Sequence, residues 1–146
     1  MIEKNLAIEL KVTTQKISNL MQLKFDEYGL TFGLLYLMKL IDSNPKANQK
    51  ELANMMRFTE GAMSISVKRL RNLGMVEKAQ LESDMRYHKL VITDKGREVL
   101  YDYQEYLFKI MKDMFEGFSE DELKKLDEFI TRVNKNLDKV IIKGII

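Results

Sequence analysis

Residues that can bind phosphate or base edges recur at helical spacing between Thr59 and Gly74. Met63, Val67 and Leu70 stand at i, i+4 and i+7, which predicts that they face a core. The opposite face of such a helix carries Gly61, Ser64, Ile65, Lys68 and Arg71 or Asn72. A serine hydroxyl can bond a base edge or a phosphate, and a lysine can reach guanine or phosphate. This face therefore suits nucleic acid, although an ordinary solvated helix face has a similar composition.

The start of the same helix has its own chemistry. Thr59 is a good N-cap, and the small residues Gly61 and Ala62 would let backbone N–H groups approach a phosphate. Glu60 complicates this reading, because a carboxylate repels phosphate. It also stabilises a helix N-terminus and can accept a hydrogen bond from a cytosine amino group. We favour the structural role for Glu60.

A second candidate site lies in the stretch Glu82 to Arg86. A single arginine at the tip of a β-loop suits a narrow minor groove, whose potential attracts guanidinium groups. Asp84 stands two residues before Arg86 and could brace its side chain through a charge-assisted hydrogen bond. The alternative is an exposed loop with an incidental ion pair, which contributes little to stability.

The elements around these residues predict how they are positioned. Gln49–Met56 reads as a short helix with Leu52, Met55 and Met56 inward, followed by a three-residue break and the helix that Gly74 ends. Met75 and Val76 begin an extended hairpin on whose return strand Leu90 and Ile92 share one face, opposite Lys89 and Val91. Thr93 or Asp94 caps the next helix. Two helices joined by a tight turn and followed by a hairpin predict a winged helix-turn-helix, a mainly α fold with a small β-hairpin wing.

The flanking segments predict long helices. Residues 2–28 form the first, which Gly29 ends, and Thr31 caps a second with Leu34, Leu35, Met38 and Ile41 on its apolar face. Ser119 and Glu122 form a capping-box signature before the last helix. Apolar residues step by three and four through both final helices, which favours packing between two chains. Packing within one chain, against the first helix, is the alternative. The steps run through Leu100, Tyr103, Leu107, Ile110, Met114, then Leu123, Leu126, Ile130, Val133, Leu137 and Val140.

The charge is unevenly distributed along the 146 residues. The whole chain carries a net +2, but residues 46–97 hold 11 cations and 6 anions, a net of +5 that leaves −3 for the flanks. The net positive charge therefore lies on the predicted winged helix-turn-helix. The charged N-terminus lacks the apolar core of a signal peptide, and the C-terminal VIIKGII is too short to span a bilayer. We expect a cytoplasmic protein without membrane association.

Several kinds of site are excluded by composition. The chain has 0 cysteines, so it holds no disulfide, zinc thiolate or thiol switch, and its single histidine, His88, cannot anchor a His-rich metal site. It has no glycine-rich phosphate loop and no nucleophile–histidine pair. Its carboxylates occur in helix-surface mixtures with lysines, as in EDELKKLDE, which are typical of solvated faces. We expect no catalytic residue, metal or cofactor.

Together these motifs resemble the MarR family of bacterial winged-helix regulators over nearly the whole chain. The shared features are the helix ending R-L-x-x-L-G-x-V, the D-x-R wing at Asp84 and Arg86, the L-V-I-T-D-K-G that follows, and the closing helix pair. The resemblance implies one domain, 1–146, with 30–97 as the DNA-binding winged helix-turn-helix and 1–28 with 98–146 as dimerisation helices. It also implies a homodimer on a pseudo-palindromic operator in double-stranded DNA. Glu60, Gly61 and Ala62 depart from the family, which more often has Ser, Thr or a basic residue there.

The resemblance further implies a repressor released by a small aromatic or anionic ligand. The DNA-binding residues would be Thr59, Gly61, Ser64, Ile65, Lys68, Arg71, Asp84 and Arg86. Tyr28, Phe32, Tyr36 and Met38, with the Tyr101–Phe108 cluster, would line the ligand pocket. Aromatic and methionine residues at helical spacing are more often core. The alternative function is a winged-helix protein–protein adaptor that does not bind DNA.

Overall fold

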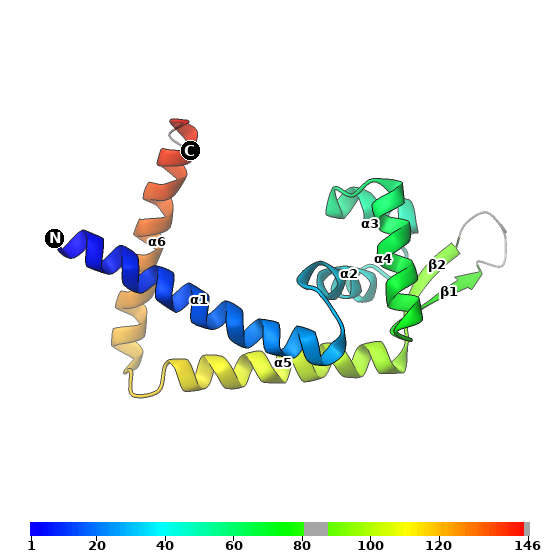
Figure 1. The fold of residues 1–146 in the computed structure, drawn as a ribbon, viewed down its shortest axis with the longest axis horizontal. Coiled ribbons are helices and arrows are strands. Elements are labelled where there is room, and N and C mark those ends of the chain that lie inside the picture. The colour runs from blue at the N-terminus through cyan, green and yellow to red at the C-terminus, as the bar shows by residue number, and fades with distance from the viewer. Residues whose placement is uncertain (81–87, 145–146) are drawn as a thin grey trace. The chain divides into compact units, whose positions relative to one another are not determined.

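The computed structural model describes residues 1–80 and 88–144, apart from the side chains of Gln80 and His88. The chain divides into two compact units, Met1–Gln104 and Glu105–Ile146. The described elements are mostly helical with one antiparallel hairpin, which confirms the predicted fold class (Figure 1). They are α1 (Ile2–Tyr28), α2 (Phe32–Ser43), α3 (Gln49–Met56), α4 (Glu60–Asn72), β1 (Val76–Gln80), β2 (His88–Ile92), α5 (Asp94–Met114) and α6 (Glu120–Ile142).

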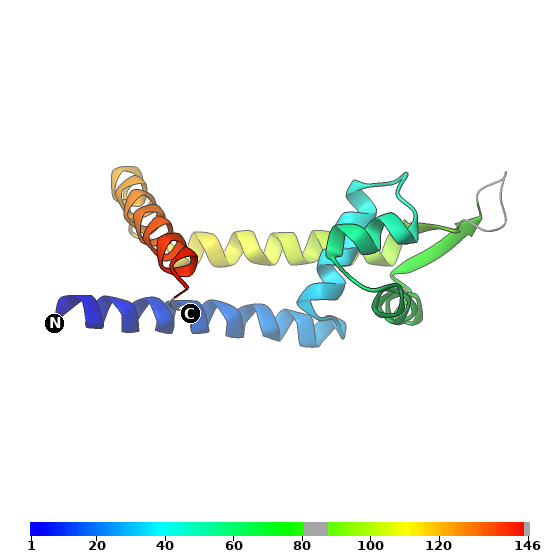
Figure 2. The same ribbon diagram turned by 90° about the horizontal axis from the view of Figure 1, so that it is seen from above.

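The turn between α1 and α2 follows the predicted caps. Gly29 is left-handed at φ 72°, where glycine lacks the Cβ that would clash. The next residue, Leu30, donates its N–H to the Phe25 carbonyl at 2.9 Å. Thr31 then accepts from the Leu34 N–H at 3.2 Å and starts α2. The first half of α1 is exposed and extends away from α2–α4 of its unit (Figures 1 and 2).

The helix pair α3–α4 forms as predicted, with one error. Asn48 caps α3 by accepting from the Glu51 N–H at 2.8 Å, and Leu52 and Ala53 are its buried residues. Met55, which we expected inside, is 46% exposed, and Met56 is half-buried. Because successive residues turn by about 100° around a helix, a core face centred on Leu52 and Ala53 leaves Met55 pointing outward.

The hairpin pairs Val76 with Ile92 and Lys78 with Leu90. Val76, Leu90 and Ile92 are buried, whereas Val91 is 38% exposed, so the predicted alternation of β2 is confirmed. A β-bridge from Lys89 to Asn48 attaches the start of α3 to the hairpin. The hairpin is therefore held against the helix pair.

Thr93, rather than Asp94, accepts the capping hydrogen bond at the start of α5. Its hydroxyl oxygen accepts from the Gly96 N–H at 3.1 Å and donates its proton to the Gly74 carbonyl at 2.6 Å. A Cβ at Gly96 would run into the backbone carbonyl of Met75 and lie 3.1 Å from Ile92 Cγ2. Glycine at this position therefore allows α5 to start directly against the hairpin.

Within the first unit, α1 is joined to α5 by an aromatic stack and a polar cluster. The rings of Phe25 and Tyr103 stack at 5.3 Å, and both residues are buried. Beside them the Tyr28 hydroxyl donates to Asp102, as does Lys24 Nζ at 3.2 Å. The hydrogen bond from Tyr28, followed by that from Lys24, lowers the pKa of Asp102.

The second unit contains the predicted capping box. Ser119 Oγ accepts from the Glu122 N–H at 3.1 Å, and the Glu122 carboxylate accepts from the Ser119 N–H at 3.0 Å. These contacts, led by the Ser119 N–H, lower the pKa of Glu122. Helix α6 has no buried residue. Along its predicted apolar seam, Leu126, Val133 and Leu137 are exposed.

In the described part of the chain, no helix is long and apolar enough to cross a membrane. The same residues contain no group of three or more His, Cys, Asp or Glu that could hold a metal ion.

Candidate nucleic-acid interface

Helix α4 separates the predicted core face from the predicted binding face. Met63, Val67 and Leu70 are at most 2% exposed. The residues that we assigned to DNA binding around α4 are all exposed, and at about 100° per residue the helical ones share one side. The structure thus gathers Thr59, Gly61, Ser64, Ile65, Lys68 and Arg71 on one accessible surface.

The start of α4 is fixed by its cap. Thr59 has an extended backbone, and its hydroxyl accepts from the Ala62 N–H at 3.1 Å. Arg57, in the turn from α3, is left-handed at φ 55°. Glu60 lies in the first helical turn, where a carboxylate interacts favourably with the helix dipole. The cap therefore fixes where α4 starts, and its first turn lies on the same exposed surface as Gly61 and Ser64.

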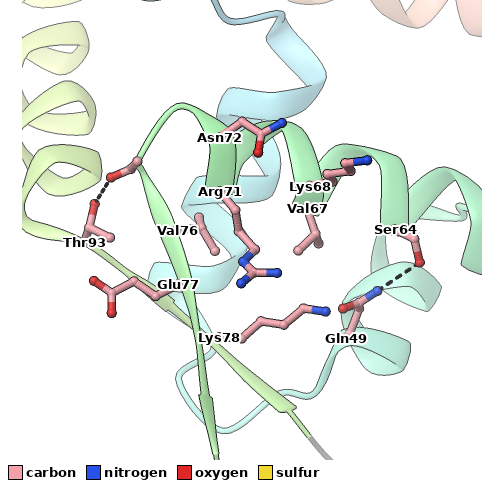
Figure 3. A pocket seen from close by; sticks show the side chains of 11 residues that line it. Gln49, Ser64, Val67, Lys68, Arg71, Asn72, Val76, Glu77, Lys78 and Thr93 are labelled. Atoms are coloured by element: carbon pink, nitrogen blue, oxygen red, sulfur yellow. Dashed lines mark hydrogen bonds between the residues drawn. The ribbon is translucent and has the colours of Figure 1, made fainter.

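A basic hollow of about 740 Å³ lies between α4 and β1 (Figure 3). Arg71 and Lys78 reach into it from its two walls, while Gln49 of α3 donates to Ser64 Oγ at 3.3 Å. Its lining includes three cations, Lys68, Arg71 and Lys78, against one carboxylate, Glu77. The hollow is suited to phosphate, because its walls present positive charge and hydrogen-bond donors.

Sequence reasoning missed Gln49 and Lys78 as residues of this surface. The signal for Lys78 was present, because it stands two residues after the buried Val76 and so shares its face of the strand. That face turns toward α4, and Lys78 enters the hollow where the core ends. Gln49 carried no such signal, because only the packing of α3 against α4 brings it beside Ser64.

Other basic residues of the module point elsewhere. Arg69 Nη2 donates to the Gly29 carbonyl at 3.5 Å, and Lys95 Nζ donates to the Leu73 carbonyl at 2.7 Å. Arg97 Nη1 lies 3.7 Å from Asp94 Oδ1, three residues earlier in the chain. Arg69 and Lys95 bond backbone carbonyls of other segments, and Arg97 pairs with an exposed neighbour on its own helix. The net charge of the segment therefore overstates what the α4 surface offers to a ligand.

The two predicted wing residues, Asp84 and Arg86, lie outside the described residues. Their assignment to a minor groove remains a prediction.

The four residues predicted to line a ligand pocket occupy different environments. Tyr28 lines a hollow of about 400 Å³ with Glu98, Val99, Tyr101 and Asp102, which does not include the other three. Burial, then its bond to Asp102, raises the pKa of Tyr28 to about 12. Phe32 and Tyr36 stack at 6.5 Å and are 60% and 44% exposed. Met38 is fully buried in the core. The pocket remains a prediction.

Comparison with known proteins gives the same assignment as the sequence motifs. No protein-family model matches the chain. It is 32% identical over 108 residues to the HTH-type transcriptional regulator BilQ of Clostridium symbiosum, covering 73% of this chain and 74% of BilQ. Transcriptional regulators of this kind are not enzymes, in agreement with the expectation from the sequence that the chain has no catalytic residue.

Two solved structures show the same fold. The MepR–DNA complex of S. aureus superposes with a TM-score of 0.83 at 12% identity, covering 90% of this chain and 98% of MepR. A MarR protein of Peptoclostridium difficile gives 0.60 at 24% identity, covering 95% and 91%. With the BilQ identity and this shared fold, the chain belongs to the MarR family of winged helix-turn-helix, DNA-binding transcriptional regulators.

Proposed function

We propose that the protein is a homodimeric repressor that occupies a pseudo-palindromic operator and blocks transcription sterically. Each protomer would place α4 in a major groove, with paired half-sites about one helical turn, roughly 34 Å, apart. The observation that carries this proposal is the exposed face of α4 beside the basic hollow. The DNA complex of MepR, a protein of the same fold, supports it. As a DNA-binding regulator it would act in the cytoplasm.

Within this interface the residues divide by chemistry. Ser64 and Ile65, which are exposed on α4, would reach base edges. Thr59 and Gly61 are exposed at the start of α4, where backbone N–H groups would face a phosphate. Lys68, Arg71 and Lys78 would bind phosphates, which fix the position of the protein on the duplex. Asp84 and Arg86 would act in the wing, at the flanking minor groove.

We further propose that residues 1–28 and 98–146 form the dimer interface around the module at 30–97. In support, α6 has no buried residue although apolar side chains repeat along it. Phe129 and Ile141 are 56% and 60% exposed, and Leu6 of α1 is 57% exposed. Surfaces this apolar are normally covered by a partner. A second copy of the chain would supply one, and it would also double the DNA contacts.

We propose that binding of a small aromatic or anionic molecule releases the protein from its operator. Tyr28, Phe32 and Tyr36 would contact it, and Met38 would support them from the core side of α2. The stacked, exposed rings of Phe32 and Tyr36 support this assignment, because exposed aromatic pairs offer a flat apolar surface to a ligand.

The proposed function is tested by selecting bound sequences from random duplexes with the full-length chain. Enrichment of a palindrome with half-sites about 10 base pairs apart is expected if a dimer reads DNA. No enrichment, with only weak retention on duplex DNA at low salt and a co-purifying protein, would favour the adaptor function instead. Repression is then tested by placing the selected operator over a reporter promoter, where the protein should lower expression.

A further inference from the structure

Ile65 is an apolar residue in an otherwise polar and basic setting. It is 72% exposed, whereas the other large apolar residues of α4, such as Met63 and Leu70, are fully buried. Its neighbours on the exposed face are Ser64 and Lys68. A single exposed apolar residue is common on protein surfaces, so exposure alone indicates nothing. Gly61, one helical turn before Ile65, is a second unusual residue on the same face.

Within the described residues, neither backbone conformation nor packing requires glycine at Gly61. Its φ is outside the left-handed region, and among the described residues a Cβ built there would meet only Thr59 Oγ1, at 4.0 Å. Gly61 lies in the first turn of α4. Because glycine loses more backbone freedom on folding than any other residue, alanine would be accommodated there at least as easily. The protein therefore leaves open space on the exposed face of α4 that an alanine would partly fill without any clash.

Gly61 and Ile65 form one local shape. They are four residues apart, so they are neighbours along one side of the helix. Helical side chains lean toward the N-terminus, which places the Ile65 side chain over the turn that starts at Gly61. The Ile65 side chain therefore projects beside a position that has no side chain, which leaves a small apolar recess on the helix surface. The exposed cations Lys68 and Arg71 lie on the same face of α4.

We propose that Ile65 reads thymine by packing against its C5-methyl group. Gly61, whose backbone N–H would face a phosphate, would also leave room for the methyl group beside Ile65 because it has no side chain. Among the four bases, thymine alone presents a methyl group in the major groove. Isoleucine has no hydrogen-bonding group to offer a base, so apolar contact is the only readout available to it. The nearby cations would hold this face against the DNA backbone. This inference rests on the proposed function and adds a base preference to it.

The test removes the methyl group from the DNA. In the selected operator each thymine is replaced in turn by deoxyuridine, which pairs identically but lacks the C5-methyl. For the unaltered protein we expect about a fourfold loss of affinity at one thymine in each half-site, the value for one buried methyl-sized group. Ile65→Ala should bind the thymine operator more weakly and show no further loss with deoxyuridine at that position.

Lys68→Ala is the matched comparison. It should weaken binding to both duplexes equally and keep the fourfold ratio between them, because it removes a phosphate contact and leaves Ile65 in place. Both positions are exposed, so the thermal unfolding midpoints should match that of the unaltered protein. If Ile65→Ala remains as sensitive to deoxyuridine as the unaltered protein at every thymine, the methyl contact is refuted while DNA binding stands. If no duplex is selected at all, the proposed function fails and this inference with it.

Discussion

Arg69 and Arg71 allow the basic hollow to be tested with two substitutions of the same residue type on one helix. They are two positions apart, so they project about 200° apart around α4. Arg71 reaches into the hollow beside Lys78. Arg69 turns the other way and donates to the Gly29 carbonyl. Arg71→Ala and Arg69→Ala therefore remove equal charge from opposite sides of the same element.

The expected magnitude follows from counterion release. Each phosphate contact contributes about 0.9 to the slope of log affinity against log salt concentration, so a dimer that loses two contacts loses about 1.8. Raising the salt from about 50 to about 200 mM should then reduce the affinity advantage of the unaltered protein over Arg71→Ala by about twelvefold. Arg69→Ala should keep the original slope.

Fluorescence anisotropy titrations on the selected operator at four or more salt concentrations measure these slopes. Urea unfolding of both variants serves as the control for folding, and we expect a small loss of stability for Arg69→Ala only. Lys78→Ala should reproduce the slope of Arg71→Ala. Equal slopes for both arginine variants, whether changed or unchanged, would refute the assignment of the hollow to phosphate.

Three further predictions concern the framework. Gly96→Ala should destabilise the protein by about 1–3 kcal/mol in urea unfolding, because its Cβ would overlap the Met75 carbonyl; an unchanged midpoint would contradict this steric reading. Because the folded protein lowers the pKa of Asp102, the hydrogen bond from Tyr28 stabilises the fold fully above about pH 4, the pKa of aspartate in the unfolded chain. This stabilisation is lost as the pH falls through the pKa of Asp102 in the folded protein. Asp102→Asn should therefore be less stable than the unaltered protein at pH 7, and the gap should close in acid; a gap that does not depend on pH would count against the ionised bond. Leu137→Glu should shift the protein to monomers in sedimentation equilibrium, whereas a monomeric unaltered protein would instead favour packing of the seam within one chain.

Local elements of the fold could be predicted because their signals are local. Gly29, Thr31 and Thr59 start or end helices through bonds with residues at most five positions away. The alternation of β2 and the i, i+4, i+7 pattern of α4 likewise need only the helix and strand periods. Met55 was placed wrongly because α3 has only eight residues, and so short a helix gives the period too few apolar positions to orient it.

The sequence by itself determined which face of α4 is open, and Ser64, Ile65 and Lys68 of the proposed binding surface lie on that face. Only the tertiary structure decided which cations belong to that surface. It brought Lys78 into the hollow, Gln49 beside Ser64, and Arg69 back to Gly29, 40 residues away in the chain. The physical reason is that a helix period depends on neighbours along the chain, whereas the partner of a long charged side chain depends on how separate elements pack.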